Sequence, residues 1–206
     1  MLVYVATYPR CGNSFLRNTM LANWPFEFHP QADREAMAAS DQLFLVKTHD
    51  RPPASFIEGE KAVQLVRHPS AAITSQWTLK GKFGAKPRPL SDFIAGCGAG
   101  GRWDDYHADW SRPGIPLWRW RYEDAFVDPV AMIESLGQFL GFPPAPPIMF
   151  TLDEAHAANP QRNPGRGIDG WREQVTPAEA ARIWNEHGAA ASQFGYSFES
   201  AAMMRA

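Results

Sequence analysis

The sequence contains little cysteine. Its 206 residues include two, Cys11 and Cys97, which stand in unrelated stretches. A disulfide framework and a zinc ribbon both need more, so both are excluded and we expect reduced thiols in a reducing compartment. The six histidines are scattered, and no Cys or His spacing suits zinc, so we expect no metal site.

Long apolar runs and a strong net charge are missing as well. No run approaches the ~20 residues of a membrane-spanning helix, and no basic leader precedes the first apolar run. The formal net charge is -2, so no global field attracts nucleic acid, and a polyanionic ligand must be held by local Arg and Lys clusters. We expect a cytoplasmic protein with neither a membrane span nor a nucleic-acid partner. The oligomeric state stays open.

Apolar runs alternate with helical patterns along the chain. Together with 45% hydrophobic and 20% charged residues, this alternation predicts a single α/β domain over residues 1–206, a parallel β-sheet flanked by helices on both faces. The predicted strands are about 2–7, 43–47, 62–66 and 117–122. The predicted helices are about 13–24, 34–39, 69–79, 89–96, 102–111, 128–140, 150–158 and 176–187.

Polar side chains follow four of these predicted strands. Arg10, His49, Arg67 and Tyr122 each stand just past a strand end. Because ligands of parallel sheets bind beyond the carboxyl ends of the strands, we expect these side chains to gather at one site.

The first seventeen residues predict a strand, a tight loop and a helix N-terminus, the geometry that gathers backbone N–H groups around an anion. Gly12 lets the backbone approach closely, Asn13 and Ser14 offer side-chain donors, and Arg10 supplies a permanent cation. An ordinary βα turn with an N-cap explains these residues equally well when they are taken alone.

Three motifs in order resemble the cytosolic-type sulfotransferases, which use 3′-phosphoadenosine 5′-phosphosulfate (PAPS). They are the loop Tyr8 to Phe15, the strand end Lys47-Thr48-His49, and Arg67 with Ser75 eight positions later. The resemblance implies a P-loop-like α/β fold with a phosphate-binding strand-loop-helix at the N-terminus, and no need for a metal.

The resemblance also assigns the catalytic residues. His49 matches the family's general base, with Asp50 as a candidate to orient its ring; without the neighbouring motifs, a structural histidine at a strand end would be the simpler interpretation. Arg10 replaces the family's loop lysine, which keeps the charge but donates a proton less readily. Lys47 is the second candidate for the cation beside the transferring group.

The donor-binding residues are implied by the same matches. Residues 162–172 resemble a late Arg-Lys-Gly…Gly-Asp-Trp-Lys motif of the family. The match implies that Arg166 and Gly167 contact the 3′-phosphate, with Arg162 as the second candidate, and that Trp171 packs beneath the loop. Asp153 stands where the family has a second adenine-stacking Phe, opposite Phe15. The implied contacts to PAPS, or to its product PAP, are Arg10, Cys11, Gly12, Asn13, Ser14, Phe15, Arg67, Ser75, Tyr122, Arg166 and Gly167.

Cys11 takes the place of a family serine in the anion-binding loop. A neighbouring arginine and a helix N-terminus both stabilise a thiolate, so one expectation is that Cys11 is more reactive than Cys97. The other is a packed, inert loop cysteine.

The resemblance predicts transfer of a sulfuryl group from PAPS to a hydroxyl of a small-molecule, natural-product or sugar acceptor. One alternative is a nucleotide-dependent phosphotransferase, although the Gly-x-x-x-x-Gly-Lys-Ser/Thr string that it would need is absent. Another is a non-catalytic protein that binds PAP or a nucleotide. Retention of both Lys47 and His49 argues against it, because a binder needs no base. The acceptor itself is not identified by the sequence.

Overall fold

The computed structural model describes residues 1–28, 33–83, 86–112, 114–142, 146–149 and 168–199. Its centre is a sheet of five parallel strands in the order β2-β3-β1-β4-β5. The strands are β1 (Leu2–Ala6), β2 (Phe26–Phe28), β3 (Leu43–Thr48), β4 (Glu60–Val66) and β5 (Leu117–Arg121). The predicted α/β fold with a parallel sheet is confirmed.

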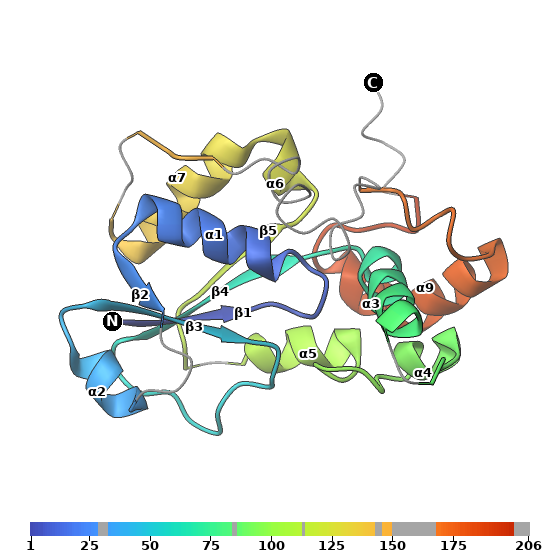
Figure 1. Cartoon of the computed structure of the whole chain (residues 1–206), viewed down its shortest axis with the longest axis horizontal. Helices are drawn as coiled ribbons and strands as arrows, with labels where there is room; N and C mark the ends of the chain where they lie inside the picture. The colour runs from blue at the N-terminus through green and yellow to red at the C-terminus, as the bar shows by residue number, and fades with distance from the viewer. Residues whose placement is uncertain (29–32, 84–85, 113, 143–145, 150–167, 200–206) are drawn as a thin grey trace.

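Side chains of β1 alternate between two cores, one on each face of the sheet. Leu2, Tyr4 and Ala6 belong to one buried cluster, whereas Val3 and Val5 belong to the other. This alternation follows from the period-2 geometry of a strand, and burial on both faces explains why the run is apolar throughout. In Figure 1, α1, α6 and α7 lie above the sheet, and α2 and α5 lie below it.

The helices begin and end at residues suited to those positions. In α7 (Pro129–Leu140), the Asp128 side chain accepts a hydrogen bond from Ala131 N–H, and Gly141 ends the helix in the left-handed conformation. Helix α9 (Pro177–Ser192) begins with a capping box formed by Thr176 and Glu179. The other helices are α1 (Asn13–Asn23), α2 (Arg34–Ala39), α3 (Pro69–Phe83), α4 (Leu90–Ile94), α5 (Trp103–Trp110) and α6 (Asp124–Val127).

The strand order reverses at β1. From β1 the chain passes through α1 to β2 and then β3 on one side, and from β3 it crosses to β4 and β5 on the other. The carboxyl end of β1 is therefore the topological switch point, where ligands of open parallel sheets bind. Helix α3 contacts α4 and α9, and all three lie toward this carboxyl edge in Figure 1.

Several element boundaries differ from the predictions. The short strand β2 and the one-turn helix α6 were not predicted, and α3 continues to residue 83 rather than ending near 79. The helix predicted at 150–158 lies outside the described residues. Among the residues that the structure does describe, no helix has the length and apolar content needed to span a membrane.

Candidate active site

The loop after β1 turns through two residues in the left-handed region, Arg10 at φ 69° and Gly12 at φ 87°. A hydrogen bond from Cys11 N–H to the Tyr8 carbonyl, 3.1 Å long, closes the turn. A Cβ at Gly12 would lie 2.6 Å from two carbons of the Tyr122 ring, so only glycine fits there. The loop thus brings its backbone directly against β5's carboxyl end.

The N-terminus of α1 follows this loop and is open to an anion. Its first turn has no side-chain cap and no acidic residue. The Asn13 amide points inward, where it donates to the Val5 carbonyl at 3.1 Å and to Thr7 Oγ1 at 2.7 Å, while Ser14 is exposed. Asn13 therefore pins the loop to β1, and the backbone N–H groups with the helix dipole make this end positive.

Three of the predicted donor-binding residues meet around Arg10. Its Nε donates to Ser75 Oγ at 3.0 Å, and Nη1 of Arg67 donates to the Arg10 carbonyl at 3.1 Å. The Arg67 guanidinium also lies 4.6 Å from the centre of the Tyr122 ring. Residues from the ends of β1, β4 and β5 and from α3 thus form one contiguous cluster. It holds three of the four side chains that were expected to gather at the strand ends, Arg10, Arg67 and Tyr122.

Two aromatic residues extend this cluster along α1. The Tyr122 ring meets Phe126 edge to face at 4.7 Å, and Phe126 packs on Phe15 at 5.1 Å between ring centres. Phe15 is 7% exposed and belongs to the core beneath α1. Its predicted stacking on adenine stays a prediction.

His49 lies beyond β3, on the other side of β1. Its Nδ1 is 2.8 Å from the Thr7 carbonyl, and because a carbonyl only accepts, Nδ1 carries the proton and Nε2 carries the lone pair of the neutral ring. Burial lowers the pKa of His49, and the Lys47 and Arg10 charges lower it further, against the raising effects of the Thr7 bond and the Asp50 carboxylate. The expected orientation by Asp50 is wrong, because the Thr7 carbonyl holds the ring.

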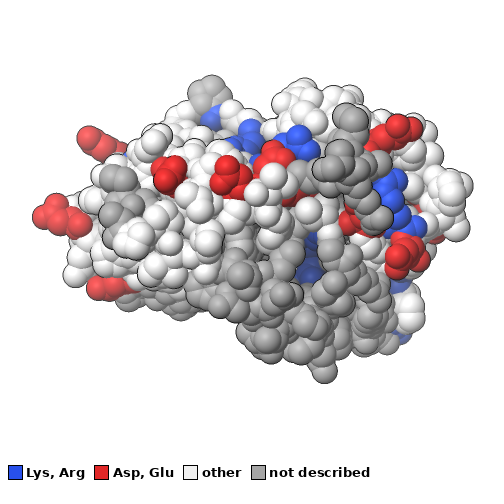
Figure 2. Space-filling model, turned by 90° about the horizontal axis from the view of Figure 1, so that it is seen from above, with Lys and Arg blue, Asp and Glu red and all other residues white. Residues whose placement is uncertain are grey.

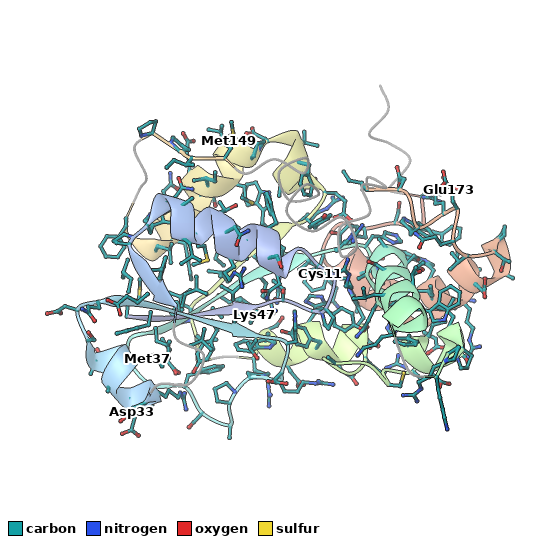
Figure 3. The ribbon with its side chains drawn as sticks, viewed as in Figure 1. Cys11, Asp33, Met37, Lys47, Met149 and Glu173 are labelled. Carbon is teal, nitrogen blue, oxygen red and sulfur yellow. The ribbon has the colours of Figure 1, made fainter. Side chains whose placement is uncertain are left out.

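Lys47 is exposed near the carboxyl end of β3, on the same face of the strand as the buried Leu43 and Leu45, and it pairs in register with Val5 of β1. Figure 3 shows it near the carboxyl end of β3, with Cys11 in the loop before α1. Seen from above the sheet, Lys and Arg atoms are visible within a hollow near the middle of the molecule (Figure 2). The basic groups that a polyanion needs are therefore local, as the small net charge requires.

Comparison with protein families matches residues 3–163 to the family described as "Sulfotransferase domain". The chain belongs to the sulfotransferase family. The resemblance to PAPS-dependent enzymes that the motifs carried is thereby confirmed. Comparison of the sequence with curated proteins finds no match.

Solved structures of other sulfotransferases share the fold. Mouse sulfotransferase SULT7A1 complexed with PAP is 15% identical, with a TM-score of 0.75 over 97% of this chain and 88% of that chain. Retinol dehydratase in complex with androsterone and inactive cofactor PAP is 14% identical, with a TM-score of 0.61 over 92% and 80%. The sulfotransferase domain of the Synechococcus PCC 7002 olefin synthase is 18% identical, with a TM-score of 0.59 over 95% and 94%.

The expectation of a reactive Cys11 in this sulfotransferase is wrong. Its side chain is fully buried, and burial raises the pKa of the thiol to about 12 despite the opposing charges of Arg67 and Arg10. Cys97 is the exposed cysteine. The alternative of a packed loop cysteine describes Cys11 correctly.

The remaining predicted residues fall outside the described parts of the chain. Arg166 and Gly167, with the reserve Arg162 and the departure at Asp153, all lie within 150–167. Trp171, which follows them, is 3% exposed. Thr7 was not predicted as a site residue, although its carbonyl orients His49 and its hydroxyl accepts a bond from Asn13. Any residue type has a backbone carbonyl, so the sequence contains no signal for this role.

Proposed function

We propose that this sulfotransferase moves a sulfuryl group from PAPS to a hydroxyl of a small-molecule, natural-product or sugar acceptor, with His49 as general base. The observation that carries the proposal is the placement of His49. Its ring is fixed through Nδ1 by the Thr7 carbonyl, one strand away from the cluster of Arg10, Arg67 and Ser75. A base and an anion-binding cluster at one sheet edge are what sulfuryl transfer requires.

The residues of the cluster fit an anionic nucleotide. Arg67 Nε is buried and has no hydrogen-bond partner among the described residues, a donor that a bound phosphate would satisfy. Gly12 keeps the loop free of a side chain, and the first turn of α1 has no cap. When bound, PAPS supplies the electrophilic sulfur and a phosphate leaving group. Arg67 and Ser75 would hold the 3′-phosphate, and Arg10 with residues 11–14 the 5′-phosphate.

His49 would take the acceptor's proton at Nε2. A lowered pKa keeps the ring neutral at pH 7, so the lone pair is available without prior deprotonation. Arg10 and Lys47 would stabilise negative charge beside the transferring group. Because a guanidinium does not readily give up a proton, Arg10 acts as a fixed cation.

The PAP in two of the compared structures supports the choice of donor. ATP and AMP lack a 3′-phosphate, so the proposed site should favour PAP over both. A phosphotransferase would prefer ATP, and a non-catalytic binder would hold PAP without turnover.

Titration calorimetry with PAP and ATP tests the donor site. We expect the wild-type protein to bind PAP and to bind ATP poorly, and Arg67→Ala to weaken PAP binding by about 1.5–3 kcal/mol, the size of charge-assisted hydrogen bonds. Transfer of radiolabelled sulfuryl from PAPS to a panel of phenols, alcohols and sugars then tests the reaction. Unchanged PAP affinity in Arg67→Ala would remove Arg67 from the donor site.

A further inference from the structure

His68 is a buried histidine directly beside the proposed donor site and has no part in the proposed chemistry. It stands between Arg67 and Pro69, where β4 passes into α3, and it is 1% exposed. Two segments from the C-terminal part of the chain surround it, the turn at residues 168–174 and helix α9.

The His68 imidazole is sandwiched between two tryptophans. Trp171 and Trp184 stack on it at 5.5 Å each, with interplanar angles of 13° and 16°, and Tyr196 meets its edge at 5.5 Å. Trp171 belongs to the turn and Trp184 to α9. One ring therefore joins three segments that are distant in sequence.

Hydrogen bonds fix the orientation of the ring within the sandwich. Nε2 lies 3.2 Å from the Ser197 carbonyl and must carry the proton, and Nδ1 accepts from Ser70 N–H at 3.2 Å. Burial lowers the pKa of His68 to about 4, helped by the nearby charges of Arg172, Arg121 and Arg67. The ring is neutral at pH 7 and both its nitrogens are satisfied.

The backbone around His68 is equally constrained. His68 N–H donates to Glu123 Oε1 at 3.1 Å, and the Tyr196 hydroxyl lies 2.5 Å from Glu123 Oε2 and 2.8 Å from the Val66 carbonyl. Arg67 lies between these two anchored positions and projects the guanidinium that reaches the Arg10 carbonyl.

We propose that His68 is a positioning residue for recognition of the donor's 3′-phosphate: by clamping the turn at 168–174 and α9 onto the backbone of Arg67, it fixes the direction of the Arg67 guanidinium. This inference rests on the proposed donor site. Histidine suits the position because it is flat enough to stack and has polar atoms at both edges. Phenylalanine would leave Ser70 N–H and the Ser197 carbonyl without these bonds, and glutamine would not fill the sandwich.

The test compares PAP with AMP, which differ in the 3′-phosphate. We expect His68→Ala to lower the ratio of PAP affinity to AMP affinity by about tenfold or more, the size of the loss seen when residues that orient metal ligands are removed. AMP affinity should stay within about twofold, because Asn13 still anchors the loop after β1 to Val5 and Thr7 when the Arg67 bond to the Arg10 carbonyl is lost. The dissociation constants of both nucleotides are measured by calorimetry on wild type and variant.

His187→Ala is the matched control for a loss of stability. His187 is also fully buried and lies on α9, but its ring nitrogens face the Ile94 carbonyl and Asp104 instead of the segment around Arg67 that His68 contacts. It should lower the melting temperature and leave the nucleotide ratio unchanged. Trp184→Leu removes one plane of the sandwich and should lower the ratio in the same direction as His68→Ala, which covers the case in which His68→Ala does not fold.

Three results would overturn the inference. His68 is only structural if the ratio of PAP affinity to AMP affinity is unchanged in a folded His68→Ala variant or, should that variant not fold, in Trp184→Leu. The same conclusion follows if His187→Ala lowers this ratio as much as His68→Ala does. A wild-type protein that binds AMP as tightly as PAP would remove the donor-site proposal itself, and with it this inference.

Discussion

Gly12 is held at φ 87° between the Tyr122 ring and Leu65. Gly141, which ends α7, has nearly the same conformation at φ 85°, but a Cβ there would meet nothing within 4 Å. An alanine at either position would therefore cost about 1–2 kcal/mol for its left-handed backbone. Only at residue 12 would its Cβ also clash with neighbouring side chains. Substituting each in turn separates backbone strain from the requirement for space at the loop.

We predict that Gly12→Ala lowers PAP affinity at least about tenfold, because the added Cβ displaces Tyr122 and, through it, the stacked Arg67. Gly141→Ala should lose about 1 kcal/mol of unfolding free energy and keep its PAP affinity. Calorimetric titration and urea denaturation measure the two quantities. Equal effects of both variants on PAP binding would show that the loop tolerates a side chain at residue 12.

The two cysteines should differ in reactivity in the order opposite to the sequence-based expectation. With its pKa raised to about 12, Cys11 has almost no thiolate at pH 8, and its sulfur is buried. Cys97 is exposed, so iodoacetamide should label Cys97 first and leave PAP binding intact. Mass spectrometry of the labelled peptides gives the order. The structure would be contradicted if Cys11 were labelled early and if bound PAP prevented this labelling.

At the scale of elements, one charged cluster attaches α2 to the sheet. Glu60, at the start of β4, has a fully buried side chain that accepts bonds from Arg34 Nη2 at 2.6 Å, Tyr4 OH at 2.6 Å and Ile57 N–H at 3.0 Å. Burial alone would raise the pKa of Glu60, but these donors outweigh it and the pKa is lowered. The carboxylate is stable in the interior only while its partners remain.

We predict that Arg34→Ala destabilises the fold by about 2–3 kcal/mol at pH 7, less than the 3–5 typical of a fully buried pair because the Arg34 side chain is 34% exposed. A lowered pKa contributes stability that is present above the unfolded value of 4.5 and lost as the pH falls through the folded value. In the variant Glu60 is buried without its cation, so its pKa rises and stability is lost with increasing pH instead. The deficit should therefore shrink toward pH 4.

Arg88→Ala is the control for this prediction. Arg88 pairs with Asp92 four residues later, but its side chain is 54% exposed, and such pairs contribute about 0.3–0.5 kcal/mol. Urea denaturation of both variants at pH 4 and pH 7 gives the comparison. If the loss of unfolding free energy in Arg34→Ala is the same at pH 4 and pH 7, the loss does not come from leaving the Glu60 carboxylate buried without a cation.

For the whole molecule, the fold was predictable where strands are buried on both faces. In a chain that alternates between apolar runs and helical patterns, the apolar runs in β1, β3 and β4 indicate strands of a buried parallel sheet. Strand β2 has three residues and pairs with β3 alone, too short for a periodic signal. The positions of the strand ends in the sequence predicted that Arg10, His49, Arg67 and Tyr122 lie together at the carboxyl edge. Arg10, Arg67 and Tyr122 are in contact there, and His49 bonds Thr7 one strand away.

What the sequence could not predict depends on packing between distant segments. Cys11 has the neighbours of a reactive thiol along the chain, but tertiary packing buries it and reverses the direction of its pKa shift. The ring of His49 is oriented by a backbone carbonyl rather than by the adjacent Asp50. His68 gains its partners from residues about a hundred positions away.

The most direct test of the account compares turnover and PAP binding in wild type and His49→Ala at neutral pH. If His49 is the general base, kcat should fall by roughly 10²–10⁴ while PAP affinity stays within a few fold, because His49 bonds Thr7 and not the residues of the Arg10 cluster. The acid limb of the wild-type kcat/KM profile should lie below pH 6.5, since the pKa of His49 is lowered from that value. Substantial activity in His49→Ala would remove His49 as the base and leave Lys47 as the next candidate, and an equal loss of binding and turnover would make His49 a structural residue.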